Sequence, residues 1–416
     1  MKDGRLFFSV VFLNALIDLG HKIALQNTVF KVYDGSQQII LVAIINACIL
    51  LPFIALVMPV AKLADTHNKV KIMRATATAS LLLTLAITVF YSAGWFWPAM
   101  IMTLLMAIQS AFYSPAKLAY LKLCWGSSRL SEANGWAQTA SISGILMGTL
   151  AFSVGFEHLY SGQVIVLADT NALIALLWPL GLVLVSLAML QLYWTYRIPL
   201  LKEPALEQGA INSKTKTSSV SRQSLFELLS HRRRLLPVLC LALFWSVGQG
   251  MLAAFPAFAK AHAGINNTVV IQGVLATTGL GLALGAIAVG RLSGRRIELR
   301  FVPLGVVIMA LGLTSLSFLS EAIAFAMVYF MMGIASACLI VPLNAYLQKN
   351  TPSEQLGGLI ASSNFLQNIA MLAMLLLTIV MALWGIDSRY LLQLMAALTA
   401  IIGAYLSFNI LVDSRS

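Results

Sequence analysis

Residues 113–117 read Tyr-Ser-Pro-Ala-Lys, and residues 133–135 read Ala-Asn-Gly, in strongly apolar surroundings. About 227 residues later, residues 341–345 read Val-Pro-Leu-Asn-Ala, and a Gly-Gly pair and Asn364 follow. Each stretch presents a proline, a polar residue and then an amide-bearing segment in the same order. The repetition indicates a chain of two similar halves. Membrane transporters are often built from such repeats, with the site between them.

The composition indicates a membrane protein. Hydrophobic residues make up 59% of the 416 residues, charged residues only 10%, and the mean hydropathy is +0.87. Soluble domains carry about a quarter charged residues. A bilayer core needs roughly 20 apolar residues per helix. We therefore predict an all-α polytopic protein with twelve transmembrane helices, centred near residues 16, 50, 82, 106, 144, 184, 247, 280, 310, 334, 370 and 400.

A polar segment interrupts the apolar runs at residues 197–234, where Pro, Ser, Lys and Arg are frequent. Six of the twelve predicted helices precede it and six follow it. We therefore expect an N-terminal six-helix bundle over residues 1–196, a mobile cytoplasmic linker over 197–234 and a C-terminal six-helix bundle over 235–416.

The distribution of positive charge predicts the orientation. Of the 27 Lys and Arg residues, Lys31, Lys260 and Arg389 fall on one side of the predicted membrane and Lys22 falls within the first helix. The other 23 lie on or beside the opposite side, which predicts that both termini are cytoplasmic. The net charge of +12 then reflects this bias and contact with anionic lipid, so we expect no nucleic-acid partner.

The sequence indicates neither a cleavable signal peptide nor a disulfide or metal site. The first apolar run contains Asp18, His21 and Lys22 and lacks a small-residue cleavage site, so we expect it to be retained as a helix rather than removed as a signal. The four cysteines are scattered among separate apolar segments. They show neither a disulfide framework nor metal-ligand spacing, and we expect no metal and no cofactor.

Asp18 is the most informative polar residue, because an acid inside a membrane helix is costly and is a functional site by default. Asn14, His21 and Lys22 share its helical face, at spacings of four, seven and eight residues along the run. One interpretation is a local ion pair between Asp18 and Lys22. The other is a face that lines a transport path and contacts substrate through all four residues.

The fourth predicted helix repeats this pattern. Gln109, Tyr113 and Lys117 are spaced by four residues, and Pro115 leaves a backbone carbonyl without its helical partner. A lysine there can bind a phosphate as a point charge. The alternative is a lysine that extends toward the membrane interface.

Amide side chains gather in corresponding helices of the two halves. Such amides can bridge helices or contact a substrate, and their concentration favours the second interpretation for the set, which comprises Asn134, Gln138, Asn344, Asn364, Gln367 and Asn368. Small residues four apart, Gly144 with Gly148 and Gly281 with Gly285, instead predict close helix packing.

Two basic segments about 225 residues apart, residues 61–71 and 290–296, are predicted to form tight cytoplasmic turns. The first resembles the loop motif of the major facilitator superfamily, in which a glycine, an aspartate four residues later and a basic cluster follow one another. Asp65, Lys69 and Lys71 match, although Ala61 replaces the glycine. The resemblance implies gating by an acid near a helix amino terminus. The second segment carries Arg291 and Arg295 but has Gly290 in place of the acid.

A narrower resemblance rests on residues 12–18, which read Phe-Leu-Asn-Ala-Leu-Ile-Asp, together with 113–117, 133–135 and 341–345. These motifs resemble the bacterial lysophospholipid transporter family. The resemblance implies flipping of lysophospholipids, notably lysophosphatidylethanolamine, across the bacterial inner membrane for reacylation. The residues that it implicates are Asp18, Lys117, Asn134, Asn344 and Asn364. Some relatives carry a fused acyltransferase and acyl carrier protein synthetase; here we expect a separate enzyme as partner, and a monomeric transporter.

The chemistry of a lysolipid fits these residues: Lys117 for the phosphate, Asp18 for an ammonium and amides for the glycerol and ester, with alternating access moving the head. A proton-coupled drug or metabolite antiporter remains an alternative of the same fold. An acyltransferase is disfavoured because none of the five histidines has an aspartate five residues later. A receptor that does not transport is a further alternative.

Overall fold

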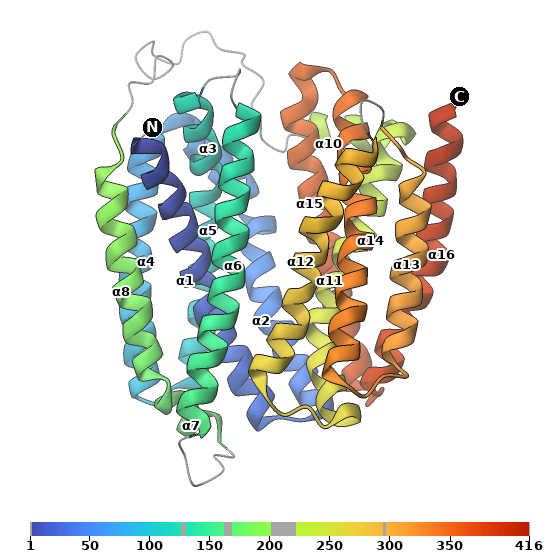
Figure 1. The fold of residues 1–416 in the computed structure, drawn as a ribbon. Helices are drawn as coiled ribbons and strands as arrows, with labels where there is room; N and C mark the ends of the chain where they lie inside the picture. Colours follow the sequence, from blue (N-terminus) through green and yellow to red (C-terminus); the bar gives the residue numbers. More distant parts are fainter. Residues whose placement is uncertain (1, 126–129, 162–168, 201–221, 294–296, 416) are drawn as a thin grey trace. The chain divides into compact units, whose positions relative to one another are not determined.

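The computed structural model describes residues 2–125, 130–161, 169–200, 222–293 and 297–415. Within these ranges the chain is helical and contains no strand. The helices are α1 (Lys2–Val32), α2 (Gly35–Ala55), α3 (Val57–Thr66), α4 (Lys69–Ser92), α5 (Phe96–Trp125), α6 (Leu130–Ser161), α7 (Thr170–Leu176), α8 (Trp178–Arg197), α10 (Arg222–Ser230), α11 (Arg232–Ala263), α12 (Thr268–Ser293), α13 (Phe301–Leu316), α14 (Ala322–Lys349), α15 (Ser353–Leu383) and α16 (Ser388–Arg415) (Figure 1).

Each of the twelve apolar runs predicted from the sequence falls within a helix, which confirms the predicted fold class. Eleven helices of the described chain are long and apolar enough to span a membrane, and the twelfth, α13, is apolar but shorter. Its 16 residues rise about 24 Å, less than a typical hydrocarbon core. Three further short helices, α3, α7 and α10, lie beside the long ones in sequence.

The chain divides into two compact units. Unit 1 comprises Met1–Val32 and Leu51–Lys216, and unit 2 comprises Tyr33–Leu50 and Thr217–Ser416. Most of α2 therefore packs with the helices of the second unit, although it follows α1 directly in sequence. Residues 201–221, inside the predicted linker, lie outside the described residues, whereas residues 222–230 of that segment form α10.

In unit 1, α1 lies alongside α6, and α4 lies alongside α5 and α8 (Figure 1). Small residues permit the first contact: a Cβ atom at Gly144 would overlap the carbonyl oxygen of Phe12, and one at Gly148 would lie 2.9 Å from the carbonyl oxygen of Leu16. The prediction of close packing at this pair is confirmed. Phe7, stacked on Tyr120 at 5.1 Å between ring centroids, belongs to the apolar core at one end of the unit.

In unit 2, α12 lies alongside α14, and α11 alongside α15 and α16. A Cβ atom at Gly281 would overlap the carbonyl oxygen of Phe330, and one at Gly285 would lie 2.9 Å from the Cβ atom of Ala337. The second predicted pair is therefore also a packing contact. Pro115 and Pro342 both lie inside unbroken helices, α5 and α14, so each removes one backbone hydrogen bond without ending its helix.

Candidate functional site

A polar cluster lies inside unit 1, where α1, α5 and α8 meet. Asn14 and Asp18 are one turn apart on α1, and Nδ2 of Asn14 donates to Oδ2 of Asp18 at 3.1 Å. Ser110 of α5 donates a hydrogen bond to the same carboxylate oxygen. The common face predicted from the spacing of Asn14 and Asp18 is therefore present, and α5 supplies its partner.

Two glutamines fix the amide of Asn14. Nε2 of Gln191, on α8, donates to Oδ1 of Asn14 at 3.0 Å, and Nε2 of Gln109, on α5, donates to the same oxygen at 3.4 Å. Gln191 is fully buried, and Asn14 and Gln109 are nearly so. Buried amides must be hydrogen-bonded to offset the loss of water, and this network does so for most of their atoms.

Tyr113 and Lys117 extend the cluster along α5. The Lys117 Nζ atom lies 5.8 Å from the centre of the Tyr113 ring. Lys117 is within electrostatic range of Asp18 but forms no ion pair with it among the described residues. The Tyr113 hydroxyl and the Oδ1 atom of Asp18 are buried, and neither has a hydrogen-bond partner among the described residues. The cluster thus holds an acid, a lysine and three unsatisfied polar atoms, the third of which is Oε1 of Gln191.

His21 makes its hydrogen bonds to residues outside this cluster. Its Nδ1 atom lies 2.8 Å from the Tyr91 hydroxyl, and its Nε2 atom lies 3.1 Å from the carbonyl oxygen of Ala99. Because a carbonyl can only accept, Nε2 carries a proton and donates to Ala99. The ring, 1% exposed, is therefore hydrogen-bonded at both nitrogens and ties α1 to α4 and α5.

Lys22 does not make the local ion pair that one interpretation of the sequence required. In the described part of the chain, no ion pair joins Lys22 to Asp18, whose hydrogen-bond donors are Asn14 and Ser110. The structure does not support that interpretation, since the groups that hold the carboxylate are Asn14 and Ser110. Lys22 itself is half-buried.

The predicted amides outside this cluster occupy varied environments. Asn134 and Gln138 of α6 are exposed, as are Asn344 of α14 and Asn364 of α15. Gln367 is buried and donates from Nε2 to Oγ of Ser363 at 2.8 Å, which is a contact within α15. Asn368 is half-buried. These residues form no common network among the described side chains.

The predicted gating residues lie near helix ends, but the local structure differs from the expected turn. Residues 61–66 belong to α3, so Asp65 is in the last turn of one helix instead of at the start of the next. The side chain that caps α4 is Asn68, whose Oδ1 accepts from the backbone N–H groups of Val70 and Lys71 at 3.1 and 3.2 Å. An asparagine is a strong N-cap, so Asn68, and not Asp65, occupies the amino terminus of α4.

The structure describes only some of the other predicted gating side chains. Lys69 is half-buried, and Lys71 and Arg291 are exposed. The side chain of Asp65 and the whole of Arg295 lie outside the described residues. The gating role of all five therefore stays a prediction.

Ser110 and Gln191 were not predicted from the sequence. Ser110 is adjacent to the predicted Gln109, and serine is common enough in membrane helices to carry no signal by itself. Gln191 offers a clearer signal, since it is the one amide side chain between Trp178 and Arg197. A search for single amides in apolar runs would have found it.

Comparison with known proteins identifies the superfamily. Residues 7–375 match the sequence profile of the Major Facilitator Superfamily. The chain belongs to this superfamily. It is therefore a multi-pass membrane transporter, in agreement with its helices and its polar cluster.

Within the superfamily, the chain is similar to proteins named lysophospholipid transporter. It is 26% identical over 275 residues to the one of Klebsiella pneumoniae, an alignment that spans 65% of this chain and 64% of that protein. It is 28% identical over 348 residues to the one of Photorhabdus laumondii, spanning 82% of this chain and 78% of that protein. The match to the Klebsiella protein thus covers less than two thirds of that relative's length.

Solved structures of facilitators share the fold. A bacterial homologue of the human lysosomal transporter Spinster, in an inward-facing and unoccupied conformation, has a TM-score of 0.65 at 14% identity, covering 97% of each chain. The nucleoside transporter NupG has a TM-score of 0.70 at 11% identity, covering 99% of each chain. At these identities the likeness concerns the fold alone.

Proposed function

We propose that this facilitator moves lysophospholipids, in particular lysophosphatidylethanolamine, across the bacterial inner membrane to the cytoplasmic leaflet, where they are reacylated. The observation that carries the proposal is the pair of opposite charges, Asp18 and Lys117, held near each other inside an apolar bundle with unsatisfied atoms beside them. The similarity to proteins named lysophospholipid transporter supports the same substrate class.

The two charges match a zwitterionic head group. A phosphodiester is an acceptor of hydrogen bonds, so it pairs with the ammonium of Lys117 and with the hydroxyl of Tyr113, which has no other acceptor among the described residues. A primary ammonium pairs with Oδ1 of Asp18. A buried polar atom without a partner costs about 1–3 kcal/mol, and a substrate head group that fills both vacancies recovers this cost on binding.

The exposed amides supply the rest of the proposed path. Asn364 is exposed although it lies well inside α15, and an amide that faced lipid there would lack hydrogen bonds. We therefore assign a water-lined position to Asn364, and we propose the same for the exposed amides of Asn134, Gln138 and Asn344. With Asn368 they would contact the glycerol hydroxyl and the ester, while the acyl chain stays in apolar surroundings.

The cycle is alternating access without a dedicated coupling ion. Removal of the product by a separate acyltransferase and acyl carrier protein synthetase would sustain net flux toward the cytoplasmic leaflet. The protein acts as a monomer in this scheme, with both termini cytoplasmic as the distribution of Lys and Arg predicts, and it performs no chemical step itself. Asp65, Lys69, Lys71, Arg291 and Arg295 are proposed to govern closure on that side.

The test measures the movement of labelled lysophosphatidylethanolamine between leaflets of reconstituted vesicles. The native protein should accelerate it, and Asp18→Ala and Lys117→Ala should each reduce the rate by at least about 100-fold, as loss of a buried charge pair implies. Ser186→Ala is the matched control, because the exposed Ser186 hydroxyl bonds only to the Leu182 carbonyl of its own helix.

A double variant separates binding from folding. Asp18→Asn with Lys117→Gln removes both charges and leaves no unpaired ion, so it should fold at least as well as either single variant and still fail to move lysolipid. Native protein that leaves lysolipid movement at the rate of empty vesicles would overturn the proposal. In that case, proton-driven exchange of soluble cations by the same vesicles tests the antiporter alternative.

A further inference from the structure

The hydrogen bonds around Asp18 are arranged unequally between its two carboxylate oxygens. Oδ2 accepts from Nδ2 of Asn14 at 3.1 Å and from the Ser110 hydroxyl. Oδ1 is buried and accepts from no group in the described ranges. Both donors that reach this carboxylate in the described ranges, Asn14 and Ser110, therefore act on Oδ2, and Oδ1 remains available.

The orientation of the Asn14 amide produces this inequality. An amide has an accepting end and a donating end, and either could face Asp18. Its oxygen accepts from Gln191 at 3.0 Å and from Gln109 at 3.4 Å. These two donors hold the oxygen toward α8 and α5, so Nδ2 must point toward Asp18. Gln191 makes the shorter of the two bonds.

Ser110 fixes the carboxylate from the other side. Its hydroxyl has a single proton, and the oxygens within reach are Oδ2 of Asp18 and, at 3.2 Å, Oε1 of Gln109. The charged oxygen is the stronger acceptor, so the proton goes to Asp18. The hydroxyl oxygen in turn lies 3.4 Å from Nδ2 of Asn14, which closes the network.

We infer that Gln191 and Ser110 are positioning residues, which direct the donors found in the described ranges to Oδ2 of Asp18 and so leave Oδ1 free for substrate. Neither residue touches the substrate through these contacts; each acts through the carboxylate or through Asn14. The inference rests on the proposed function for the identity of the substrate, but not for the geometry of the carboxylate.

The transport test uses Gln191→Leu, which keeps a similar volume but donates no hydrogen bond. With labelled lysophosphatidylethanolamine, KM should rise about tenfold while the maximal rate stays within about twofold, because substrate meets a misoriented carboxylate. Gln191→Asn, which keeps the donor, should recover part of the loss. In the Asn14→Ala background, Gln191→Leu should have no further effect on KM, since the two act in series. Additive effects in this cycle would overturn the inference.

Infrared spectroscopy tests the positioning role of Gln191 and Ser110 without measuring transport. The infrared carboxylate bands of Asp18 are obtained as the difference between native protein and Asp18→Asn, and their splitting reports whether one oxygen or both are hydrogen-bonded. The splitting should change in Gln191→Leu and in Ser110→Ala and be unchanged in Ser186→Ala. If native protein moves no lysolipid and yet the bands change, the proposed function fails and the positioning role stands. Bands that are identical in all four proteins would overturn the positioning role.

Discussion

The two units are built alike in their packing and differ in their interiors. In unit 1, α1 carries Asp18 and α5 carries Lys117 within long helices, and a buried hydrogen-bond network joins Asp18 to Asn14 and Gln191. In unit 2, the Asp, Glu, Lys and Arg residues of the described helices lie near helix ends, as Lys260 and Arg291 do. The two units thus share helical packing, whereas charged side chains in the middle of helices occur among the described residues of unit 1 only.

This difference has a physical reason. A charge inside a membrane helix is tolerated where partners surround it, and each additional charged site would need its own set of donors and acceptors. With a single charged site, only one such set of hydrogen-bond partners has to be built. The amides of unit 2 are cheaper to place, because a neutral group requires only hydrogen bonds or water.

The largest expected effect tests this division between the units. Lys117→Gln should reduce lysolipid movement by at least about 100-fold because it leaves Asp18 without its counter-charge. Asn344→Ala and Asn364→Ala should each reduce it by about two- to tenfold, the range for one neutral hydrogen bond. Rates of labelled lysophosphatidylethanolamine movement in matched vesicles measure all three.

The opposite ranking would break the comparison. If Asn364→Ala abolished movement and Lys117→Gln preserved it, the chemistry would reside in unit 2. Thr314→Ala serves as the control in unit 2, because the exposed Thr314 hydroxyl donates at 2.8 Å to the Ala310 carbonyl of its own helix.

Much of the fold could be predicted from the sequence, because apolar run length is dictated by the bilayer. All twelve runs lie in helices, and the glycine pairs mark real contacts. The helical state of residues 57–66 was not predicted, since this stretch is short and joins a basic turn. Nor could the sequence show that Tyr33–Leu50 packs with unit 2, which depends on long-range contacts that local pattern does not encode.

A second prediction compares the packing that the units share. Gly281→Ala and Gly144→Ala should each destabilise the protein by about 1–3 kcal/mol, because the new methyl group would overlap a backbone carbonyl that cannot easily move. The matched controls are Gly273→Ala on α12 and Gly135→Ala on α6, where a Cβ atom meets nothing within 4 Å. These should be neutral or slightly stabilising. Thermal unfolding in detergent distinguishes the two outcomes, and equal midpoints across all four variants would contradict close packing.

The candidate site was only partly predictable. Helical spacing correctly placed Asn14 beside Asp18, since residues four apart share a face whatever surrounds them. It could not show that Ser110 and Gln191 complete the cluster, because that depends on how α5 and α8 approach α1. Spacing also grouped His21 with Asp18, whereas the ring bonds to Tyr91 and Ala99, so a shared face did not imply a shared network.

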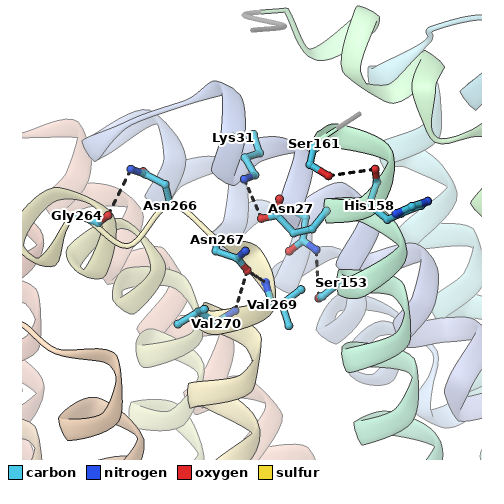
Figure 2. A network of polar contacts seen from close by, with 11 residues as sticks. Asn27, Lys31, Ser153, His158, Ser161, Gly264, Asn266, Asn267, Val269 and Val270 are labelled. Carbon is cyan, nitrogen blue, oxygen red and sulfur yellow. Dashed lines mark hydrogen bonds and ion pairs between the residues drawn. The ribbon is translucent and has the colours of Figure 1, made fainter. Parts of the chain in front are cut away.

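Both units also have polar contacts toward the ends of their helices. Unit 1 has an ion pair between Lys31 and Glu157 at 2.8 Å. It also has a hydrogen bond from Asn27 to Ser153 at 3.2 Å (Figure 2). Unit 2 has an ion pair between Lys260 and Asp34 at 2.7 Å and a second ion pair between His262 and Asp387 at 2.9 Å. The unit 1 contacts are mostly buried, with Lys31 10% and Glu157 14% exposed. In unit 2, Asp34 is 80% and Asp387 47% exposed, and exposed pairs of this kind contribute little to stability.

The smallest expected effect concerns Asp387, which precedes α16. Burial tends to raise the pKa of this carboxyl, but the hydrogen bonds from the Arg389 N–H at 2.7 Å and from His262, with the charges of both residues, lower it overall. A lowered pKa in the folded state stabilises the protein above the ordinary carboxyl value of about 3.9, and this contribution is lost as the pH falls through the lower folded value. The side chain is 47% exposed, so the effect is small. Between pH 6 and pH 3, the unfolding temperature of native protein should fall by about 1–2 °C more than that of Asp387→Asn; parallel curves would show that this helix-end contact, unlike the cluster around Asp18, contributes nothing measurable.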